Sequence, residues 1–314
     1  MEDYPTWIIQ WFYAIGLLSM MFNLFLIFLI IVKNQRRDSF IYFLLWYQIS
    51  CSFLNLCITI LVQPIFILPF WIVRNVSPLL EMMNIGPIFS MMLLAFSFFH
   101  LFQSILCSFL RKHQEIAKIE HEYVLEPYQI VIFCIIISVL NMVCMIVFWQ
   151  SLVVGERMGV VLAENHLKIP PTTDLIIILI DHKSSILFAI YAILNLSLIL
   201  SMACHMLKML SDVRMVFSKI SFERNKKSVY SLLAQFLTIL VFLAVPIIVF
   251  FIDPFDNQGI SCLLETILSI HSPVNCIVLI LSTPAFRSRL AFWRKGHRSM
   301  MVAPATPSAF SRKT

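Results

Sequence analysis

Charged residues are scarce in this sequence. Only 13% of the 314 residues are Asp, Glu, Lys or Arg, which is about half the share expected of a soluble globular protein. Hydrophobic residues make up 60%, and the mean hydropathy is +0.89. A surface in contact with water needs more charge than this, so the composition excludes a soluble domain and a disordered chain. It predicts a single helical bundle that crosses a membrane several times.

The motifs of most enzymes are missing as well. With only 6 glycines, the chain has little material for a Gly-rich loop that cradles phosphates. It contains no His-Glu-x-x-His, no Gly-x-Ser-x-Gly and no paired intramembrane aspartates. The 8 cysteines have no zinc-site spacing, and none lies in an expected outer loop. We therefore expect no enzymatic activity, no cofactor, no metal site and no disulfide between the third helix and an outer loop.

Long uncharged runs are abundant instead. A bilayer core requires about 20 apolar residues in a helix, and seven runs reach that length. Only one charged residue, Glu265, falls inside any of them. The predicted fold class is all-α, a bundle of seven transmembrane helices within residues 1–283. The expected spans are residues 7–32, 41–70, 85–110, 128–150, 184–207, 228–252 and 261–283.

The basic residues are sorted between the two sides of the predicted bundle. Of the 23 Lys and Arg residues, 19 lie in segments 33–39, 111–127, 208–227 and 284–314, whereas the opposite loops hold 4. By the positive-inside rule the N-terminus is outside and the C-terminus is cytosolic. The net charge of +6 then reflects this rule and attraction to inner-leaflet membrane lipid, so no nucleic-acid partner is implied.

Seven helices in this orientation are the layout of a G-protein-coupled receptor, an analogy of fold alone.

Polar residues inside the expected helices are candidates for ligand binding, because such residues are costly in lipid and turn toward the bundle interior. Helix 3 carries His100 and Gln103, and helix 7 carries Glu265 and His271. One interpretation is that these four side chains bind a ligand; the other is that they only form hydrogen bonds between helices. Because the third helix has no acidic residue and the rest of the interior is apolar, we expect a small, largely apolar ligand.

Two prolines and one sequon add further expectations. Pro246 and Pro273 interrupt helices 6 and 7, where each acts either as a hinge or as a static kink. Asn75-Val76-Ser77 is a glycosylation sequence on the expected outer side.

The expected cytosolic side contains two amphipathic stretches. Segment 208–227 reads as a continuation of helix 5, and residues 284–298 read as a helix lying on the membrane surface. Both stretches suit either partner docking or interfacial anchoring. Residues 299–314, rich in Pro, Ser, Thr and Ala, are expected to be a disordered tail.

Four strings in the chain resemble those of a known family. They are YFLLWYQIS at 42–50, ILVQPIFILP at 60–69, FLRKHQEIA at 109–117 and LSTPAFR at 281–287. In this order they resemble the nematode serpentine chemoreceptors, in the related class H and class I group and most like class I. One departure is the stretch FWIVRNVSP at 70–78, which has neither the Gly nor the Cys often found there in that family.

This resemblance implies a chemosensory (olfactory or gustatory) receptor in the plasma membrane, expected in the cilium of a sensory neuron. It implies an environmental small molecule as ligand and a heterotrimeric G protein as partner. Together with the charge placement, it assigns six residues to the surface that faces the G protein: Arg111, Lys112, His113, Lys226, Lys227 and Arg287. The alternatives are a multi-pass transporter and a seven-span ligand-gated odorant channel; in the channel the N-terminus would lie inside.

Overall fold

The computed structural model describes residues 6–33, 40–67, 72–120, 124–153, 175–178, 182–212, 219–252, 258–283 and 286–287. Seven helical segments in these ranges are long and apolar enough to cross a membrane, so the predicted seven-helix bundle is confirmed. They comprise α1 (Thr6–Lys33), α2 (Phe40–Leu56), α4 (Pro87–Glu120), α5 (Pro127–Gln150), α7 (His182–Asp212), α8 (Lys219–Ile239), and α10 (Gln258–Ser269) with α11 (His271–Ser282).

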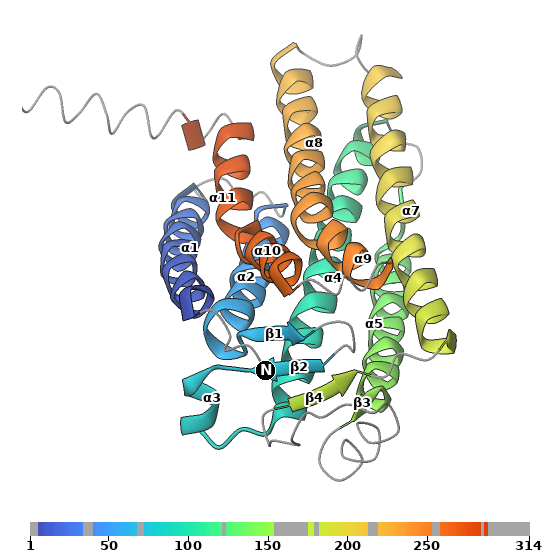
Figure 1. Ribbon diagram of the computed structural model, residues 1–314. Helices are drawn as coiled ribbons and strands as arrows, with labels where there is room; N and C mark the ends of the chain where they lie inside the picture. The colour runs from blue at the N-terminus through green and yellow to red at the C-terminus, as the bar shows by residue number, and fades with distance from the viewer. Residues whose placement is uncertain are drawn as a thin grey trace, which may run out of the picture.

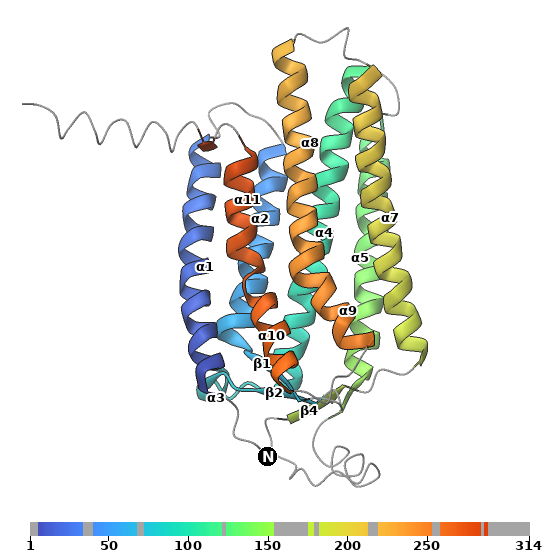
Figure 2. The same cartoon turned by 45° about the horizontal axis from the view of Figure 1, so that its top comes forward.

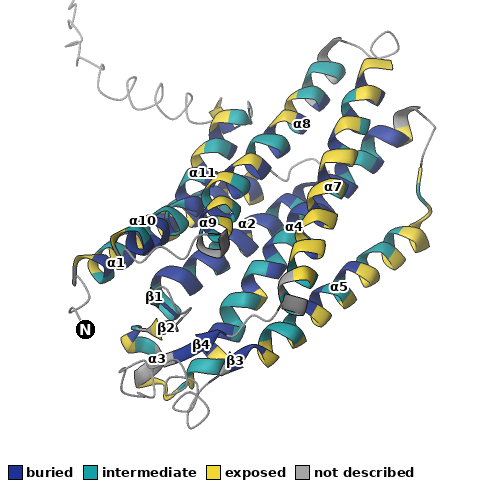
Figure 3. Cartoon of the chain, turned by 45° about the vertical axis from the view of Figure 1, so that its right-hand side comes forward, coloured by how far each residue is buried: buried dark blue, intermediate teal, exposed yellow. Residues whose placement is uncertain are grey.

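The helices expose apolar side chains on the outside of the bundle. On α5, for example, Val131, Ile135 and Ile146 are about half exposed. Figure 3 shows buried residues on the faces of α2 and α4 that are turned inward and exposed ones along α5 and α7. An apolar outer surface of this extent suits contact with lipid tails.

A small antiparallel sheet closes one end of the bundle. Its strands are β1 (Pro64–Ile67), β2 (Ile72–Asn75), β4 (Leu175–Ile178) and β3 (Leu152–Val153), in that spatial order. A short helix, α3 (Pro78–Met82), follows β2. Figures 1 and 2 place the sheet beside the start of α4. We call this the sheet end, and the opposite end, where Arg111, Lys112 and Lys118 lie on α4, the basic end.

The expected second span, 41–70, extends too far, because the helix ends earlier at a proline. A π-helical turn, η1 (Cys57–Leu61), follows α2, and β1 then begins at Pro64. Pro64 has no N–H and disfavours a helical conformation at Gln63, whose φ of 47° turns the chain. The Ile60 carbonyl, four residues before Pro64, instead accepts a hydrogen bond from the Ser77 hydroxyl at 2.8 Å. The apolar run after Pro64 therefore forms a strand.

Two boundaries at the basic end also differ from expectation. The third helix was expected to end at residue 110, but α4 continues to Glu120. Most of residues 111–120 are strong helix formers, and Glu115 pairs with Arg111 and Lys112 along the helix. The apolar run therefore ends at these charged residues, but the helix continues. Likewise, residues 219–227 do not continue the fifth helix: α7 ends at Asp212, and Lys219 begins α8.

Both candidate hinge prolines are buried and lie just after an irregularity in their helices. A π-helical turn, η3 (Leu240–Ala244), precedes Pro246, and α9 (Val245–Ile252) continues beyond it. The helix is also interrupted at Ile270, between α10 and α11, just before Pro273. These irregularities agree with kinks at both sites, because each proline leaves the carbonyl four residues earlier without its helical partner. A hinge function at either proline stays a prediction.

The cysteines behave as the sequence suggests. All eight are free, and six of them are buried. Of the expected membrane-surface helix at 284–298, only Phe286 and Arg287 lie among the described residues, and the 299–314 tail lies outside them. Both expectations stay predictions.

Candidate functional site

At the basic end of α4, three of four consecutive residues contact three different parts of the structure. Successive residues of an α-helix point about 100° apart, so Arg111, Lys112, His113 and Gln114 cover all sides of the helix. Arg111 is partly exposed, Lys112 turns toward α8, His113 toward α7 and Gln114 toward the segment before α5. This string is therefore the centre of the contacts between helices at the basic end.

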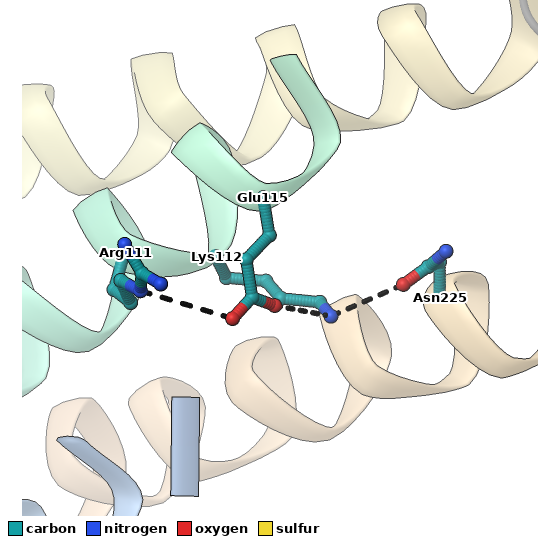
Figure 4. Close-up of polar contacts among 4 residues, drawn as sticks. All are labelled: Arg111, Lys112, Glu115 and Asn225. Carbon is teal, nitrogen blue, oxygen red and sulfur yellow. Dashed lines mark hydrogen bonds and ion pairs between the residues drawn. The ribbon is translucent and has the colours of Figure 1, made fainter. Parts of the chain in front are cut away.

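Lys112 is buried, which corrects its assignment to a partner-facing surface. Only 5% of the residue is exposed, and its ammonium lies 3.1 Å from both Glu115 Oε2 and Asn225 Oδ1 (Figure 4). The ammonium also stands 5.2 Å from the centre of the Phe40 ring. A buried charge needs such partners to replace water. Lys112 thus joins α4 to α8 and to the start of α2.

Arg111 belongs to the same cluster. Its Nε lies 3.8 Å from Glu115 Oε1, so one carboxylate serves two cations (Figure 4). The Arg111 side chain is 26% exposed, which leaves it accessible from the basic end.

His113 faces a second histidine across the α4–α7 contact. His113 Nε2 and His205 Nδ1 are 2.7 Å apart, and the ring centroids are 5.0 Å apart with the ring planes inclined by 27°. On the other side of its ring, His113 Nδ1 is 3.2 Å from Gln114 Nε2. The Gln114 carbonyl accepts the Leu125 backbone N–H at 2.8 Å.

The other residues assigned to the partner surface are more accessible. Lys227 and Arg287 are exposed. Lys226 is partly buried, with its ammonium 5.9 Å from the ring centres of Phe222 and Tyr230. The accessible members of the predicted set are therefore Arg111, Lys227 and Arg287, with Lys226 partly covered.

At the sheet end, Glu265 is buried against the edge of the sheet. Glu265 Oε1 accepts the Phe66 backbone N–H at 2.7 Å, and the Ser261 hydroxyl lies 3.1 Å from the Phe66 carbonyl oxygen. Two α10 side chains therefore satisfy the free edge of β1, which is an edge strand. Glu265 Oε2 is buried and has no hydrogen-bond partner among the described residues.

His271 has a similar open position. It is 1% exposed, and its Nδ1 lies 2.9 Å from the Leu268 carbonyl oxygen. Its Nε2 is buried without a hydrogen-bond partner in the described part of the chain. Glu265 and His271 are thus the two predicted ligand-binding residues with a polar atom left to satisfy.

His100 lies at the boundary between α2 and α4, which departs from the expected interior position. The Trp46 indole N–H is 3.0 Å from His100 Nε2, and the Phe96 ring stacks on the imidazole at 5.6 Å. Phe96 is 50% exposed, so this group of rings reaches the outer surface of the bundle.

Gln103 is occupied by contacts between helices. It donates to the Ser138 hydroxyl at 2.8 Å and accepts from the Asn141 amide at 2.9 Å. The Asn141 carbonyl in turn accepts the Tyr191 hydroxyl at 2.7 Å. This chain joins α4, α5 and α7. Among the described residues, no hydrogen bond connects any two of His100, Gln103, Glu265 and His271.

The comparison by sequence identifies the family. Residues 2–290 match the family described as serpentine type 7TM GPCR chemoreceptor Sri. The chain belongs to this family. The chain is therefore a multi-pass membrane protein of the G-protein-coupled receptor type, in a family of receptors rather than enzymes. Its membership confirms the expected chemoreceptor class, while the finer class H and class I assignment stays a prediction.

The comparison by structure agrees about the fold. The chain is similar in structure to squid rhodopsin, with a TM-score of 0.62 over 97% of this chain and 90% of the rhodopsin chain. The sequence identity is 9%, so this likeness concerns the seven-helix fold alone. No curated protein matches the chain by sequence.

Sequence reasoning missed several residues that the structure brings into these clusters. They are Asn23, Glu115, Asn141, Tyr191, His205 and Asn225. Asn23 is buried between α1, α2 and α11, where it bonds to Gln48 and Ser272. All six are polar residues within helices, which is a sequence feature that could have identified them as candidates. Their partners could not be predicted, because the sequence does not show which helices pack against one another.

The predicted glycosylation site lies at the sheet end. Asn75 is the last residue of β2 at the sheet end. Ser77 of the same sequon is 4% exposed, because its hydroxyl bonds to Ile60. Glycosylation of Asn75 stays a prediction. In the described part of the chain, no cluster of three His, Cys, Asp or Glu side chains that could hold a metal ion occurs.

Proposed function

We propose that this receptor detects a small, largely apolar environmental molecule and responds by activating a heterotrimeric G protein. In this proposal the sheet end faces the outside of the cell and the basic end faces the cytosol. The distribution of Lys and Arg supports that orientation. The family match supports a chemosensory function, and we place the receptor in the plasma membrane of a sensory-neuron cilium.

The observation that carries the proposal is the Lys112 contact at the basic end. A buried ammonium shared between Glu115 on α4 and Asn225 on α8 holds these two helices together. If α8 moves away, the Asn225 contact is lost and the inward face of α4 becomes accessible. Ligand binding and partner binding are coupled when both favour that open state.

The ligand contact is assigned to Glu265 and His271. Each has a buried polar atom without a partner among the described residues; Glu265 lies in α10 next to the sheet, and His271 begins α11, near the middle of the helix pair. A ligand that is mostly apolar but carries a hydrogen-bond donor would satisfy Glu265 Oε2. His100 and Gln103 already bond to neighbouring helices, so they position the surrounding helices. Pro246 and Pro273, beside irregular helical turns, are the proposed hinges.

The test is a screen of small volatile molecules on cells that express the full chain, with calcium or second-messenger release as the readout. Arg111→Ala is expected to reduce the response, because Arg111 is the partly exposed cation at the centre of the basic end. Arg74→Ala is the matched control: Arg74 is an exposed arginine in β2 at the sheet end. A response undiminished by Arg111→Ala would contradict the assigned role of the basic end.

A further inference from the structure

Three aromatic side chains gather where α2 and α4 meet at the outer surface of the bundle. Phe96 stacks on the His100 imidazole, with 5.6 Å between the ring centres and 10° between the ring planes. The Trp46 ring, from α2, lies 5.5 Å from the same imidazole, centre to centre. Phe96 is 50% exposed, and Trp46 and His100 are partly exposed. We call these three residues the ring group.

The Trp46 contact fixes where the proton of His100 lies. An indole N–H only donates, so His100 Nε2 must accept the hydrogen bond of 3.0 Å. The neutral imidazole then carries its single proton on Nδ1, which is a hydrogen-bond donor. No described residue accepts a hydrogen bond from Nδ1, and this nitrogen is not buried as His271 Nε2 is. The ring group therefore presents an accessible N–H without an acceptor.

This N–H lies deep within the part of α4 that spans the membrane. At a rise of 1.5 Å per residue, His100 is about 16 Å from Arg111 at the basic end and about 20 Å from Pro87, where α4 begins. The hydrocarbon core of a bilayer is about 30 Å thick, so His100 lies near its middle. Lipid tails at that depth offer no hydrogen-bond acceptor, and an N–H without a partner there costs free energy. A bound molecule that carries an acceptor removes this cost.

The surroundings restrict the chemistry of such a molecule. A carboxylate accepts an N–H, but a charge is too costly to bring to the middle of a bilayer. A hydroxyl brings a donor of its own, for which the ring group has no remaining acceptor. The carbonyl oxygen of a ketone only accepts, so it satisfies Nδ1–H and leaves no new donor unpaired. The exposed Phe96 ring adds an apolar face on which a flat ring stacks.

We propose that Trp46, Phe96 and His100 form a lipid-facing binding site for a flat, apolar ketone dissolved in the membrane. The carbonyl oxygen of this ligand accepts from His100 Nδ1, and its rings stack on Phe96. The site is separate from Glu265 and His271, which are buried on α10 and α11. The proposal goes beyond the proposed function, because binding at the ring group requires neither the buried pair nor a G protein.

The experiment is photolabelling of the full chain in lipid nanodiscs with benzophenone, an apolar aromatic ketone, followed by mass spectrometry of the labelled peptides. Two competitors of similar shape are compared: fluorenone, which has a carbonyl, and fluorene, which has none. Fluorenone is expected to reduce labelling around the ring group at about tenfold lower concentration than fluorene, the effect of one hydrogen bond. Labelling around Val131 and Ile135, on the exposed face of α5, is expected to respond equally to both. Equal potency of the two competitors at the ring group would overturn the proposal.

Substitutions that change the donors separate hydrogen bonding from stacking. In the double variant Trp46→Phe/His100→Phe both N–H donors are removed and aromatic rings remain, so fluorenone and fluorene are expected to compete equally. In His100→Gln the amide oxygen accepts from Trp46 and the NH₂ group replaces Nδ1–H, so the preference for fluorenone is expected to remain. A preference for fluorenone that persists in the double variant would show that these N–H groups do not bind the carbonyl.

Two phenylalanines on α4 provide a matched control for stacking. Phe96→Ala removes the exposed ring of the ring group, so both competitors are expected to weaken by about threefold to tenfold. Phe89 is 59% exposed on the same helix and lies outside the ring group, so Phe89→Ala is expected to leave both competitors unchanged. Equal effects of the two substitutions would mean that the molecules bind to apolar surface in general, and the ring group would not be a site.

Discussion

The Lys112 ammonium lies 3.1 Å from the Asn225 side-chain oxygen, which joins α4 to α8 at the basic end. These residues are 113 positions apart in the chain, and both are buried. A buried ammonium needs hydrogen-bond acceptors to replace water, so this contact favours close packing of the two helices.

The first prediction concerns the strength of that contact. Asn225→Ala removes an acceptor from a buried cation and is expected to destabilise the closed bundle by about 1.5–3 kcal/mol, the usual value for a hydrogen bond to a charged group. Asn225→Asp retains an acceptor and adds a negative charge, so it should match or exceed the wild type. Thermal unfolding of the purified receptors in detergent measures both. Equal melting temperatures for Asn225→Ala and wild type would mean that the contact contributes little.

The second prediction separates two adjacent lysines on α8. Lys227 is exposed, whereas the Lys226 ammonium lies 5.9 Å from two aromatic ring centres. Lys227→Glu is expected to weaken G-protein activation while it changes stability by less than about 0.5 kcal/mol, as exposed substitutions usually do. Lys226→Glu should lower both activity and stability, because it also removes the cation–π contacts. The measurement pairs melting temperature with ligand-driven signalling; full signalling by Lys227→Glu would remove Lys227 from the partner surface.

The third prediction distinguishes two roles of Glu265. Glu265→Ala leaves the Phe66 N–H without its acceptor and should cost about 1–3 kcal/mol of stability. Glu265→Gln keeps an oxygen for Phe66 but places an NH₂ donor where Glu265 has the oxygen Oε2. If Glu265 binds the ligand, Glu265→Gln should keep the melting temperature yet lower ligand potency about tenfold or more, as expected for a lost bond of about 1.4 kcal/mol. If the ligand potency is unchanged in Glu265→Gln, Glu265 does not bind the ligand and only accepts the Phe66 N–H at the edge of the sheet.

The fourth prediction concerns orientation. An epitope tag at the N-terminus is expected to bind antibody on intact cells, and a tag at the C-terminus only after permeabilisation. The reason is the asymmetry of the basic residues. The reverse pattern would favour an odorant channel with its N-terminus inside and would invert the assignment of both ends.

Much of the fold follows from the sequence, because uncharged runs of about 20 residues have few structural solutions in a bilayer. The exceptions are local. Pro64 ends the second helix, and the apolar residues after it enter a sheet, which composition alone does not distinguish from helix. At Arg111 the change from apolar to charged residues suggested a helix end, whereas the helix continues through ion pairs to Glu120.

The candidate site was less predictable, because it depends on which helices touch. The string from Arg111 to Gln114 was recognisable, and the structure confirms that it occupies one end of the bundle. Its partners Asn225 and His205 come from segments more than 90 residues away. The burial of Lys112 and the position of His100 beside an exposed Phe96 likewise arise from packing between helices.

The most direct test of the account is guanine-nucleotide exchange on a heterotrimeric G protein, measured in membranes that contain the full chain. Asn225→Ala, which releases α8 from Lys112, is expected to raise ligand-independent exchange above the wild-type level, and Arg111→Ala added to it should abolish the increase. Exchange that stays at the level of membranes without receptor, for both wild type and Asn225→Ala, would contradict the claim that the basic end activates a G protein.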